Sequence, residues 1–402
     1  MSQETKNIAL LFASRSLRSF TAGFVAIAIS LYFYDVLKLS LVLIGALFTV
    51  GAIATPLISL LVGIFGDMYG RKLVLIIDLL TLPAALLIVL FSKNIYALAV
   101  ASAIGGFGVA GGLVGGGVGA SVGPVVTTML AENTTEENRT FVFSINNVLS
   151  TFSGAAGALL VSFIKFIPLF WIGVFLSLLS ALIVIPVNEK YKTRRKIQRN
   201  ESTSISERDK RFIKAFAITG MLNGFSMGLV TPYYPIIFHA FFHLTTSQVG
   251  YLMSAGGILT GVANLFTPYL TNKMGFLKLI TRTRIASATM MLLIPFSPSA
   301  LVAGILYLVM TPLRAISLPA QTSLMMTLIS ETRRATSSGL NQAARLLASA
   351  AATYLGGALM AFGPFSLPFG IAAGFTYINT GVYYYYFSGV PEANSVQAEK
   401  TK

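Results

Sequence analysis

The sequence contains no cysteine and few charged residues. Because cysteine is absent, the chain has no disulfide framework, no thiolate nucleophile and no thiolate metal ligand. Charged residues make up only 11% of the 402 residues, and hydrophobic residues make up 55%. A soluble domain carries roughly a quarter charged residues, so this composition cannot form a soluble surface. We therefore expect lipid to be the main solvent of this chain.

The sequence also lacks the short motifs of common catalytic and metal sites. No HExxH, CxxC, GxSxG or Walker pattern is present. The two histidines, His239 and His243, lie near one loop and make a poor metal site. We expect no catalytic residues, no metal and no cofactor, and we infer that the protein is not an enzyme.

Long apolar runs recur from Ile8 to Phe387. A run of about 18 or more residues can cross about 30 Å of hydrocarbon as a helix, at roughly 1.5 Å per residue. The first run is too long for a secretory signal, so we interpret it as a membrane helix. Pro232 and Pro235 predict a break near the outer end of the seventh run. The sequence predicts twelve transmembrane helices, at about residues 8–34, 41–64, 73–92, 96–130, 141–163, 168–188, 212–238, 247–270, 281–297, 300–329, 337–361 and 366–388.

The basic residues are distributed unevenly between the predicted loops. If both termini lie in the cytoplasm, the loops on that side hold most of the basic residues, and the outer loops hold only Lys38, Lys93 and Lys165. This distribution follows the positive-inside rule. It predicts a multi-pass protein of the plasma (cell) membrane with both termini cytoplasmic. It also accounts for the formal net charge of +15 without nucleic acid binding.

The two halves of the sequence are similar to each other. SFTAGFVAI at 19–27 matches GFSMGLVTP at 224–232, at an offset of 205 residues, and PVVTT at 124–128 matches PAQTS at 319–323, at an offset of 195. Repeats at matching membrane depths indicate a duplicated bundle. We predict an all-α polytopic fold of two pseudo-symmetric six-helix bundles. The expected parts are an amino-terminal bundle (1–188), a basic cytoplasmic linker (189–211), a carboxy-terminal bundle (212–388) and a cytoplasmic tail (389–402).

The loop between the second and third spans reads GIFGDMYGRK, with Gly63, Asp67, Gly70 and Arg71 at its main positions. It resembles the G-x-x-x-D-x-x-G-R-K signature of the major facilitator superfamily (MFS). The corresponding loop of the second half, TNKMGFLK, keeps Gly275 but lacks the acid. The resemblance extends over nearly the whole chain and implies the MFS fold. It also implies that these four residues form an inner gate.

The gate has a physical rationale in this sequence. Asp67 is expected near the start of the eleventh span, where the free N–H groups of about Thr336–Ser338 would stabilise a carboxylate. That contact would hold the two halves together on the inner side. We expect Arg71 to pair with Glu132, while the loop glycines allow a tight turn. The alternative is that Arg71 only orients its helix.

Charged and polar residues inside the spans indicate the solute. An arginine at the membrane centre costs about 2.5–3.5 kcal/mol on insertion scales, so it needs water, a partner or a ligand. Arg18 and Arg314 are the main candidates for substrate binding, because the resemblance places spans one, four, seven and ten around a central cavity. Arg345 and Asn341 are further candidates. The alternative is structural: the arginines bind backbone carbonyls or, in the first bundle, Asp78.

Proton coupling requires an acid or a histidine whose charge is costly enough to titrate usefully. Asp78 is the main candidate, because it is the acid placed well inside a span. Asp35 lies near an outer end, as does His239, and Glu132 lies near an inner end. Proton coupling itself is an implication of the family resemblance.

The sequence thus predicts a monomeric secondary active transporter that works by alternating access. Its expected partners are a small-molecule substrate, membrane lipid and protons, and the cationic cavity favours an anionic solute. One alternative is efflux of drugs or other amphipathic molecules, since the many Phe, Met and Tyr residues suit an adaptable cavity. Another is a lipid flippase or a nontransporting membrane sensor.

Overall fold

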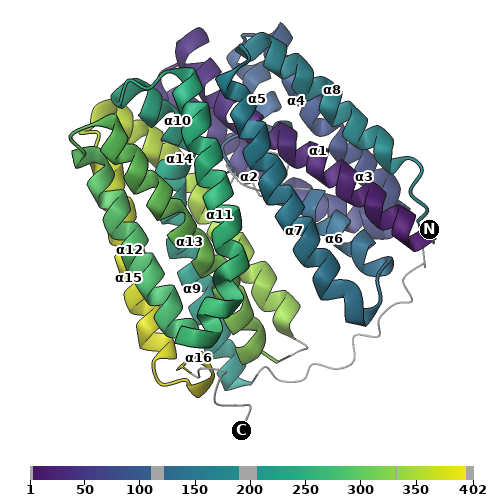
Figure 1. The fold of residues 1–402 in the computed structure, drawn as a ribbon, viewed down its shortest axis with the longest axis vertical. Helices are drawn as coiled ribbons and strands as arrows, with labels where there is room; N and C mark the ends of the chain where they lie inside the picture. Colours follow the sequence, from purple (N-terminus) through teal and green to yellow (C-terminus); the bar gives the residue numbers. More distant parts are fainter. Residues whose placement is uncertain (1–2, 110–121, 190–205, 331–332, 395–402) are drawn as a thin grey trace. The chain divides into compact units, whose positions relative to one another are not determined.

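In the computed structural model, residues 3–109, 122–189, 206–330 and 333–394 are described (Figure 1). These residues form helices joined by turns and short loops, and no strand occurs among them. The contacts divide the chain into two compact units. Unit 1 contains Met1–Glu201 and Pro235–Gly257, and unit 2 contains Ser202–Tyr234 and Ile258–Lys402.

The first half of the chain contributes eight described α-helices. A π-helical turn, Tyr32–Val36, directly follows the first of them. The helices are α1 (Gln3–Leu31), α2 (Leu41–Tyr69), α3 (Arg71–Leu79), α4 (Thr81–Phe91), α5 (Ile95–Gly105), α6 (Val122–Glu132), α7 (Glu136–Leu159) and α8 (Phe166–Val184).

The second half of the chain has a similar series of helices. The predicted break at Pro232 and Pro235 is confirmed, because α9 ends at Val230 and a 3₁₀ turn follows. A second π-helical turn, Ile237–Phe241, lies shortly after this break. The helices are α9 (Glu207–Val230), α10 (Tyr234–Ile236), α11 (Thr246–Met274), α12 (Phe276–Leu293), α13 (Ala300–Leu328), α14 (Arg334–Phe362), α15 (Leu367–Phe387) and α16 (Pro391–Asn394).

The described helices account for the twelve predicted spans. Ten helical segments are long and apolar enough to cross a membrane. The helix α15 is not among these ten, but its 21 residues are long enough for a further span. The helices α5 and α6 are the described parts of the predicted fourth span. This arrangement agrees with an all-α membrane protein built from twelve spans.

The fourth span differs from the single continuous helix predicted for residues 96–130. The helix α5 ends at Gly105, and Gly106 and Gly108 have positive φ angles of 66° and 82°. Glycine adopts such angles without strain because it lacks a Cβ, and this conformation ends a helix. Gly108 also lies directly against Phe48, with no space for a Cβ. Residues 110–121, which hold the rest of the glycine-rich segment, lie outside the described residues.

Unusual backbone features recur at the 205-residue offset found in the sequence. The π-helical turn Tyr32–Val36 corresponds in this way to Ile237–Phe241. Lys38 and His243, which are also 205 residues apart, have positive φ angles of 52° and 54°. Non-glycine residues adopt positive φ only in a few per cent of cases. The repeat therefore extends from the amino acids to rare backbone conformations.

Close helix pairs are built on glycine in both halves. In unit 1, Gly23 of α1 lies against the carbonyl oxygen of Gly154 in α7. In unit 2, Gly224 of α9 lies against the carbonyl oxygen of Arg345 in α14. Neither position has space for a Cβ. Small residues of this kind let membrane helices approach closely and gain van der Waals contact.

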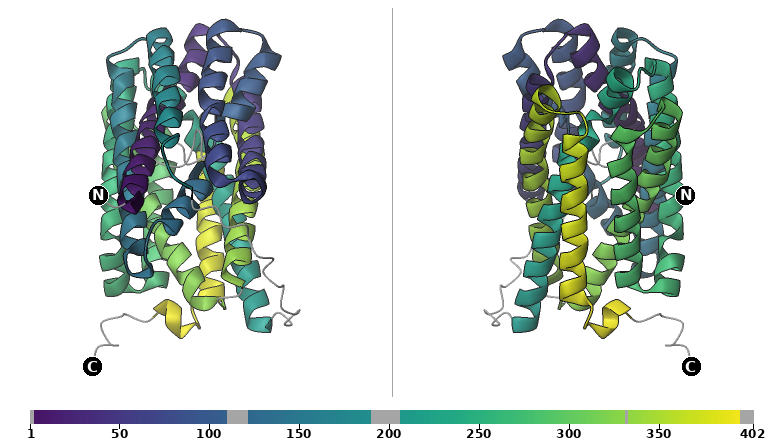
Figure 2. Two further views of the ribbon diagram at one scale, coloured as in Figure 1. Left: turned by 90° about the vertical axis from the view of Figure 1, so that its right-hand side faces the viewer. Right: turned by 90° about the vertical axis from the view of Figure 1, so that its left-hand side faces the viewer.

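Unit 2 has an apolar core around α9, α12, α13 and α15. The helix α9 packs beside α14 and α15, and α12 packs beside α13 and α15 (Figure 2). The core includes Phe216, Ile280, Leu324 and Phe387. Helix bundles in lipid gain stability mainly from packing and from hydrogen bonds between helices. Charged side chains inside such a core are costly, so they mark candidate functional sites.

Candidate functional site

The signature loop of the first half turns at Gly70. This residue has a φ angle of 102° and lies between α2 and α3. The guanidinium of Arg71 contacts the carboxylate of Glu132, the last residue of α6. The structure therefore brings together two residues that are 61 positions apart in the sequence. Their role as part of a gate stays a prediction.

The other two predicted gate residues are placed differently. Gly63 lies inside α2, away from the turn, and no atom lies within 4 Å of a Cβ built there. The tight turn therefore depends on Gly70 and not on Gly63. The backbone of Asp67 belongs to α2, but its side chain lies outside the described residues. The predicted contact of Asp67 with residues 336–338 stays a prediction.

Glu189, which follows α8, is a contact of this loop that the sequence interpretation missed. Its carboxylate accepts hydrogen bonds from the backbone N–H groups of Arg71 and Lys72, at the beginning of α3. A carboxylate at this position stabilises the free N–H groups and the positive end of the helix dipole. The 205-residue repeat could have indicated this contact. Asn394 corresponds to Glu189 at that offset, and it lies against Gly275, which corresponds to Gly70.

Arg18 lies in a polar environment within unit 1. The residue is only 1% exposed, and its Nη1 donates to the carbonyl oxygen of Leu79 at 3.4 Å. Asp78, also 1% exposed, is close enough to interact electrostatically with Arg18. These contacts are those expected of the structural alternative, but Nε and Nη2 of Arg18 have no hydrogen-bond partner among the described residues, so its substrate role is untested. They also occupy Asp78, the main candidate for proton coupling, with a permanent positive neighbour.

Arg314 lies in α13 of unit 2 and contacts only neutral groups. Its Nη2 donates to the hydroxyl of Ser226 at 3.2 Å, and its Nη1 lies 3.6 Å from the sulfur of Met291. Ser226 in turn donates to the carbonyl oxygen of Ala372 in α15. Within the described ranges, no carboxylate pairs with Arg314. The guanidinium is thus held by α9 and α12 without charge compensation.

The remaining predicted substrate residues, Arg345 and Asn341, lie one turn apart on α14. The Nη2 of Arg345 donates to Gln342 on the same helix, at 2.7 Å. The Oδ1 of Asn341 is buried against Gly220 of α9 and has no hydrogen-bond partner in the described part of the chain. Asn341 therefore lies at a helix contact, and its substrate role is untested.

Arg284 of α12 is a buried cation that the sequence interpretation missed. It is 2% exposed, and its guanidinium lies 4.7 Å from the ring centre of Tyr383. Its Nη2 donates to Gln321 at 2.6 Å, and its Nη1 donates to Asn379 at 3.3 Å. The helical period of the sequence could have revealed it, because Arg284 lies one turn after the buried Ile280 on the same face of α12. We call Arg284, Gln321, Asn379 and Tyr383 the Arg284 cluster.

Asp35 and His239 lie within hydrogen-bond distance of each other in unit 1. The Nε2 of His239 lies 3.0 Å from Oδ2 of Asp35, and the side chains are 27% and 25% exposed. The Nδ1 of His239 lies 2.7 Å from the carbonyl oxygen of Leu244. Each residue of the pair comes from one of the two π-helical turns. Such turns are frequent at functional sites.

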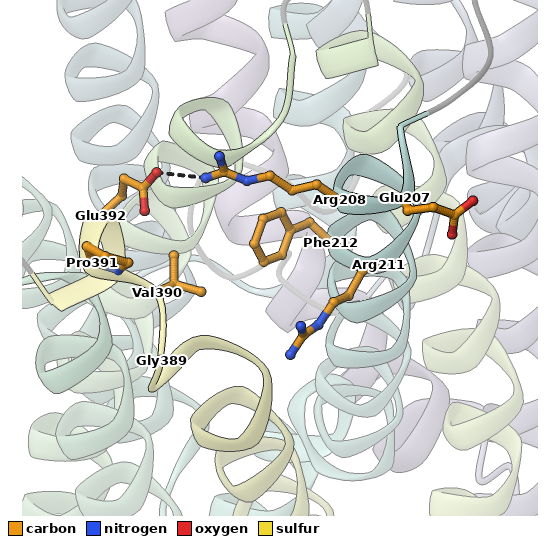
Figure 3. Close-up of a pocket in the computed structure, with 8 residues that line it drawn as sticks. All are labelled: Glu207, Arg208, Arg211, Phe212, Gly389, Val390, Pro391 and Glu392. Carbon is orange, nitrogen blue, oxygen red and sulfur yellow. Dashed lines mark hydrogen bonds and ion pairs between the residues drawn. The ribbon is translucent and has the colours of Figure 1, made fainter.

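Unit 2 also contains a pocket of about 660 Å³ where α9 begins and α16 follows α15 (Figure 3). Arg208 extends across it to Glu392 at 2.7 Å and lies over the ring of Phe212. Glu207 points away from that ion pair (Figure 3). The pocket is lined by Glu207, Arg208, Arg211, Phe212, Gly389, Val390, Pro391 and Glu392. Its contacts join the start of α9 to the segment after α15.

Three solved structures with similar folds are transporters by name. The nucleoside transporter NupG, in a mutant form, has a TM-score of 0.78 and 16% identity, with 95% of this chain and 100% of that chain covered. A POT family peptide transporter in an auto-inhibited state has a TM-score of 0.75 and 10% identity, with 97% and 98% covered. The human organic anion transporter MFSD10 (TETRAN) has a TM-score of 0.64 and 13% identity, with 95% and 100% covered. At these identities the likeness shows the fold.

The sequence comparisons give a second, independent result. No curated protein sequence matches this chain. The family model described as Major Facilitator Superfamily matches residues 11–353, and a second match covers residues 216–402. These matches confirm the predicted fold of twelve helices in two related halves. The chain therefore belongs to the Major Facilitator Superfamily, whose members are membrane transporters and not enzymes.

Proposed function

We propose that this protein is a secondary active transporter that moves a small organic anion across the plasma membrane by alternating access. The observation that carries this proposal is the environment of Arg314. This cation lies in a membrane helix and donates to a neutral hydroxyl, and no carboxylate pairs with it in the described part of the chain. An intramembrane arginine marks a substrate pathway or needs a partner. An anionic solute would supply the missing negative charge.

The choice of solute class rests on Arg314 and not on the similar structures. Those structures are named for nucleosides, peptides and organic anions, and their low identity does not choose among these classes. Drug efflux favours an apolar, adaptable cavity, whereas an uncompensated guanidinium favours a carboxylate or phosphate group. The carboxylate of an organic anion would accept hydrogen bonds from Arg314 in bidentate geometry.

The proposed transport cycle opens the solute site to one side of the membrane at a time. The bundles predicted at 1–188 and 212–388 would move against each other, with 189–211 as the linker, 389–402 as the tail and both termini in the cytoplasm. We assign the inner gate to Asp67, Gly70 and Arg71. The contacts of Arg71 with Glu132 and Glu189 support this assignment, because they hold the gate loop in one conformation.

Proton coupling is the second part of the proposal, and we assign it to Asp35 together with His239. The other two candidate acids have permanent positive neighbours: Asp78 lies near Arg18, and Glu132 contacts Arg71. Each of these carboxylates is thus engaged with an arginine in the structure, so we rank both below Asp35. The Asp35–His239 contact places an acid 3.0 Å from a histidine, the residue type most often used as a proton carrier near neutral pH, and this geometry supports the assignment.

The experiment that tests the function is flux into liposomes containing the purified protein. Labelled organic anions, a neutral sugar and a cationic drug are compared with and without a pH gradient. We expect saturable uptake of an organic anion that a pH gradient accelerates. Transport of the drug alone would support the efflux alternative, and lipid movement alone would support a flippase. An absence of any flux would favour a membrane sensor.

A further inference from the structure

The Arg284 cluster places a positive charge in the core of unit 2 without a negative partner. Arg284 lies about 12 Å along α12 from its first residue, at roughly 1.5 Å per residue. Its neighbours in the cluster are the neutral side chains of Gln321, Asn379 and Tyr383. In the part of the chain that the structure describes, no acid pairs with Arg284. Another cation, Arg314, is close enough to act on Arg284 electrostatically.

Three hydrogen-bond donors of the cluster have no acceptor among the described residues. They are Nε of Arg284, Nδ2 of Asn379 and the hydroxyl of Tyr383. All three residues are at most 2% exposed, so bulk water does not solvate these donors. A buried donor without an acceptor is costly, and a buried charge is far more so. One of the three donors belongs to the cation, and the other two lie beside it. Together they indicate that the cluster binds an acceptor that carries negative charge.

The orientation of the Asn379 amide strengthens this point. Its Oδ1 accepts a hydrogen bond from Arg284, so its NH₂ group is the end that remains free. The opposite orientation would direct two N–H bonds at a guanidinium, which has only donors. The hydrogen bond from Arg284 therefore fixes the orientation of the amide and leaves Nδ2 of Asn379 without an acceptor within the described ranges. The hydroxyl of Tyr383 adds a second donor from the same helix, one turn later.

The burial of the cluster limits the size of its ligand. Gln321 is 4% exposed, Asn379 is 1% exposed and Tyr383 is fully buried. Large apolar side chains of the unit 2 core, including Phe216 and Phe387, pack against the ring of Tyr383. An organic solute needs a cavity with several times the volume of a monatomic ion. The surroundings are suited to a single small anion.

We propose that the Arg284 cluster is a binding site for a small inorganic anion of the chloride class, built into unit 2 and separate from the site of the transported solute. The anion accepts hydrogen bonds from Arg284, Asn379 and Tyr383 and compensates the buried charge. It therefore stabilises the packing of α12 against α13 and α15. This proposal does not depend on the identity of the solute or on transport.

Thermal unfolding of the purified full-length protein in detergent tests the site. Sodium gluconate is replaced by sodium chloride at constant ionic strength, and bromide, nitrate and acetate are compared. We expect Tm to rise saturably with chloride and bromide. Equal Tm values in gluconate and in saturating chloride would overturn the proposal. A rise with acetate but not with chloride would also overturn it, because the site would then select carboxylates.

Two variants locate the effect at the cluster. Asn379→Asp places a carboxylate next to Arg284, so the protein should unfold at a higher temperature in gluconate and lose its response to chloride. Tyr383→Phe removes one donor and should raise the half-saturating chloride concentration about tenfold, which corresponds to about 1.4 kcal/mol. Tyr385→Phe, on the exposed face of the same helix, is the control and should behave like the unchanged protein. An Asn379→Asp variant with an unaltered chloride response would refute the site.

The same variants separate this site from the transport function. If the proposed transport fails and no organic anion is carried, the chloride dependence of Tm is still expected. If the chloride dependence fails, uptake of the organic anion can remain. A transported anion that raises Tm equally in Asn379→Asp and in the unchanged protein would show that the two sites are distinct, as proposed.

Discussion

His239 directs both of its ring nitrogens at acceptors: Nε2 lies 3.0 Å from Oδ2 of Asp35, and Nδ1 lies 2.7 Å from the carbonyl oxygen of Leu244. A neutral imidazole has only one N–H group, and a backbone carbonyl cannot donate. Which ring nitrogen donates depends on the tautomer, but both acceptors lie within hydrogen-bond distance of the ring. This contact between an acid and a histidine is the geometry on which the proposed coupling role rests.

Replacement of Asp35 tests this coupling. In Asp35→Asn, the amide can still donate to His239, but it can no longer take up a proton. We expect uptake driven by a pH gradient to be lost, while exchange of solute between the two sides continues. His243→Asn is a suitable control, because His243 is the other histidine and asparagine tolerates its positive φ angle. Normal pH-driven uptake by Asp35→Asn would exclude Asp35 as the coupling residue.

Arg314 is expected to bind the anionic group of the solute. Arg314→Gln removes the charge and keeps a donor for Ser226. Since a hydrogen bond to a charged group contributes about 1.5–3 kcal/mol, the KM for the organic anion should rise roughly 10-fold to 100-fold. Lys93→Gln, at an exposed loop position, is the control for a general loss of positive charge. An unchanged KM in Arg314→Gln would contradict the proposed site.

The gate assignment predicts a change in accessibility for Asp67→Asn. The predicted attraction of Asp67 to the start of α14 would be lost with the carboxylate, so we expect the inner side to open more often. The chain has no cysteine, so single cysteines can be introduced without background labelling. We expect faster labelling at inner cavity positions by a membrane-impermeant reagent applied from the cytoplasmic side. Equal labelling rates at all of these positions would argue against the gate.

Glu189 is predicted to stabilise the gate loop. Glu189→Gln removes the negative charge at the beginning of α3 and weakens the hydrogen bonds from Arg71 and Lys72. We expect a loss of about 0.5–2 kcal/mol in stability, the usual range for a helix cap. The measurement is Tm by differential scanning fluorimetry. Glu207→Gln is the matched control, because Glu207 is 88% exposed and pairs with Lys210 at the surface. A similar Tm loss in both variants would not support the cap.

The close contact of α9 with α14 predicts opposite effects for two glycines. Gly224→Ala places a methyl group against the carbonyl oxygen of Arg345, so it should destabilise unit 2 by about 1–3 kcal/mol. Gly374→Ala in α15 meets no atom within 4 Å and should be neutral or stabilise by up to about 1 kcal/mol. Denaturation monitored by circular dichroism compares the two. Equal stability of both variants would contradict the packing described for Gly224.

Much of the fold follows from the sequence because its cause is local. The apolar runs specify helices that can cross a membrane, and the proline pair correctly predicts the break after Val230. The repeat at 205 residues reappears in the π-helical turns and in the positive φ angles of Lys38 and His243. Backbone conformation depends on nearby residues, so a repeated sequence produces a repeated conformation.

The partners of the charged residues depend on the tertiary structure. Hydropathy places Arg284 near the beginning of a span, but only helix packing brings it to Asn379 and Tyr383, which are 95 and 99 positions away. Asp35 and His239 likewise meet across 204 residues. By itself, the amino-acid sequence determined the spans, the duplication and the family. Which buried charges are compensated was decided by the packing of distant helices, because charge compensation depends on distance in space.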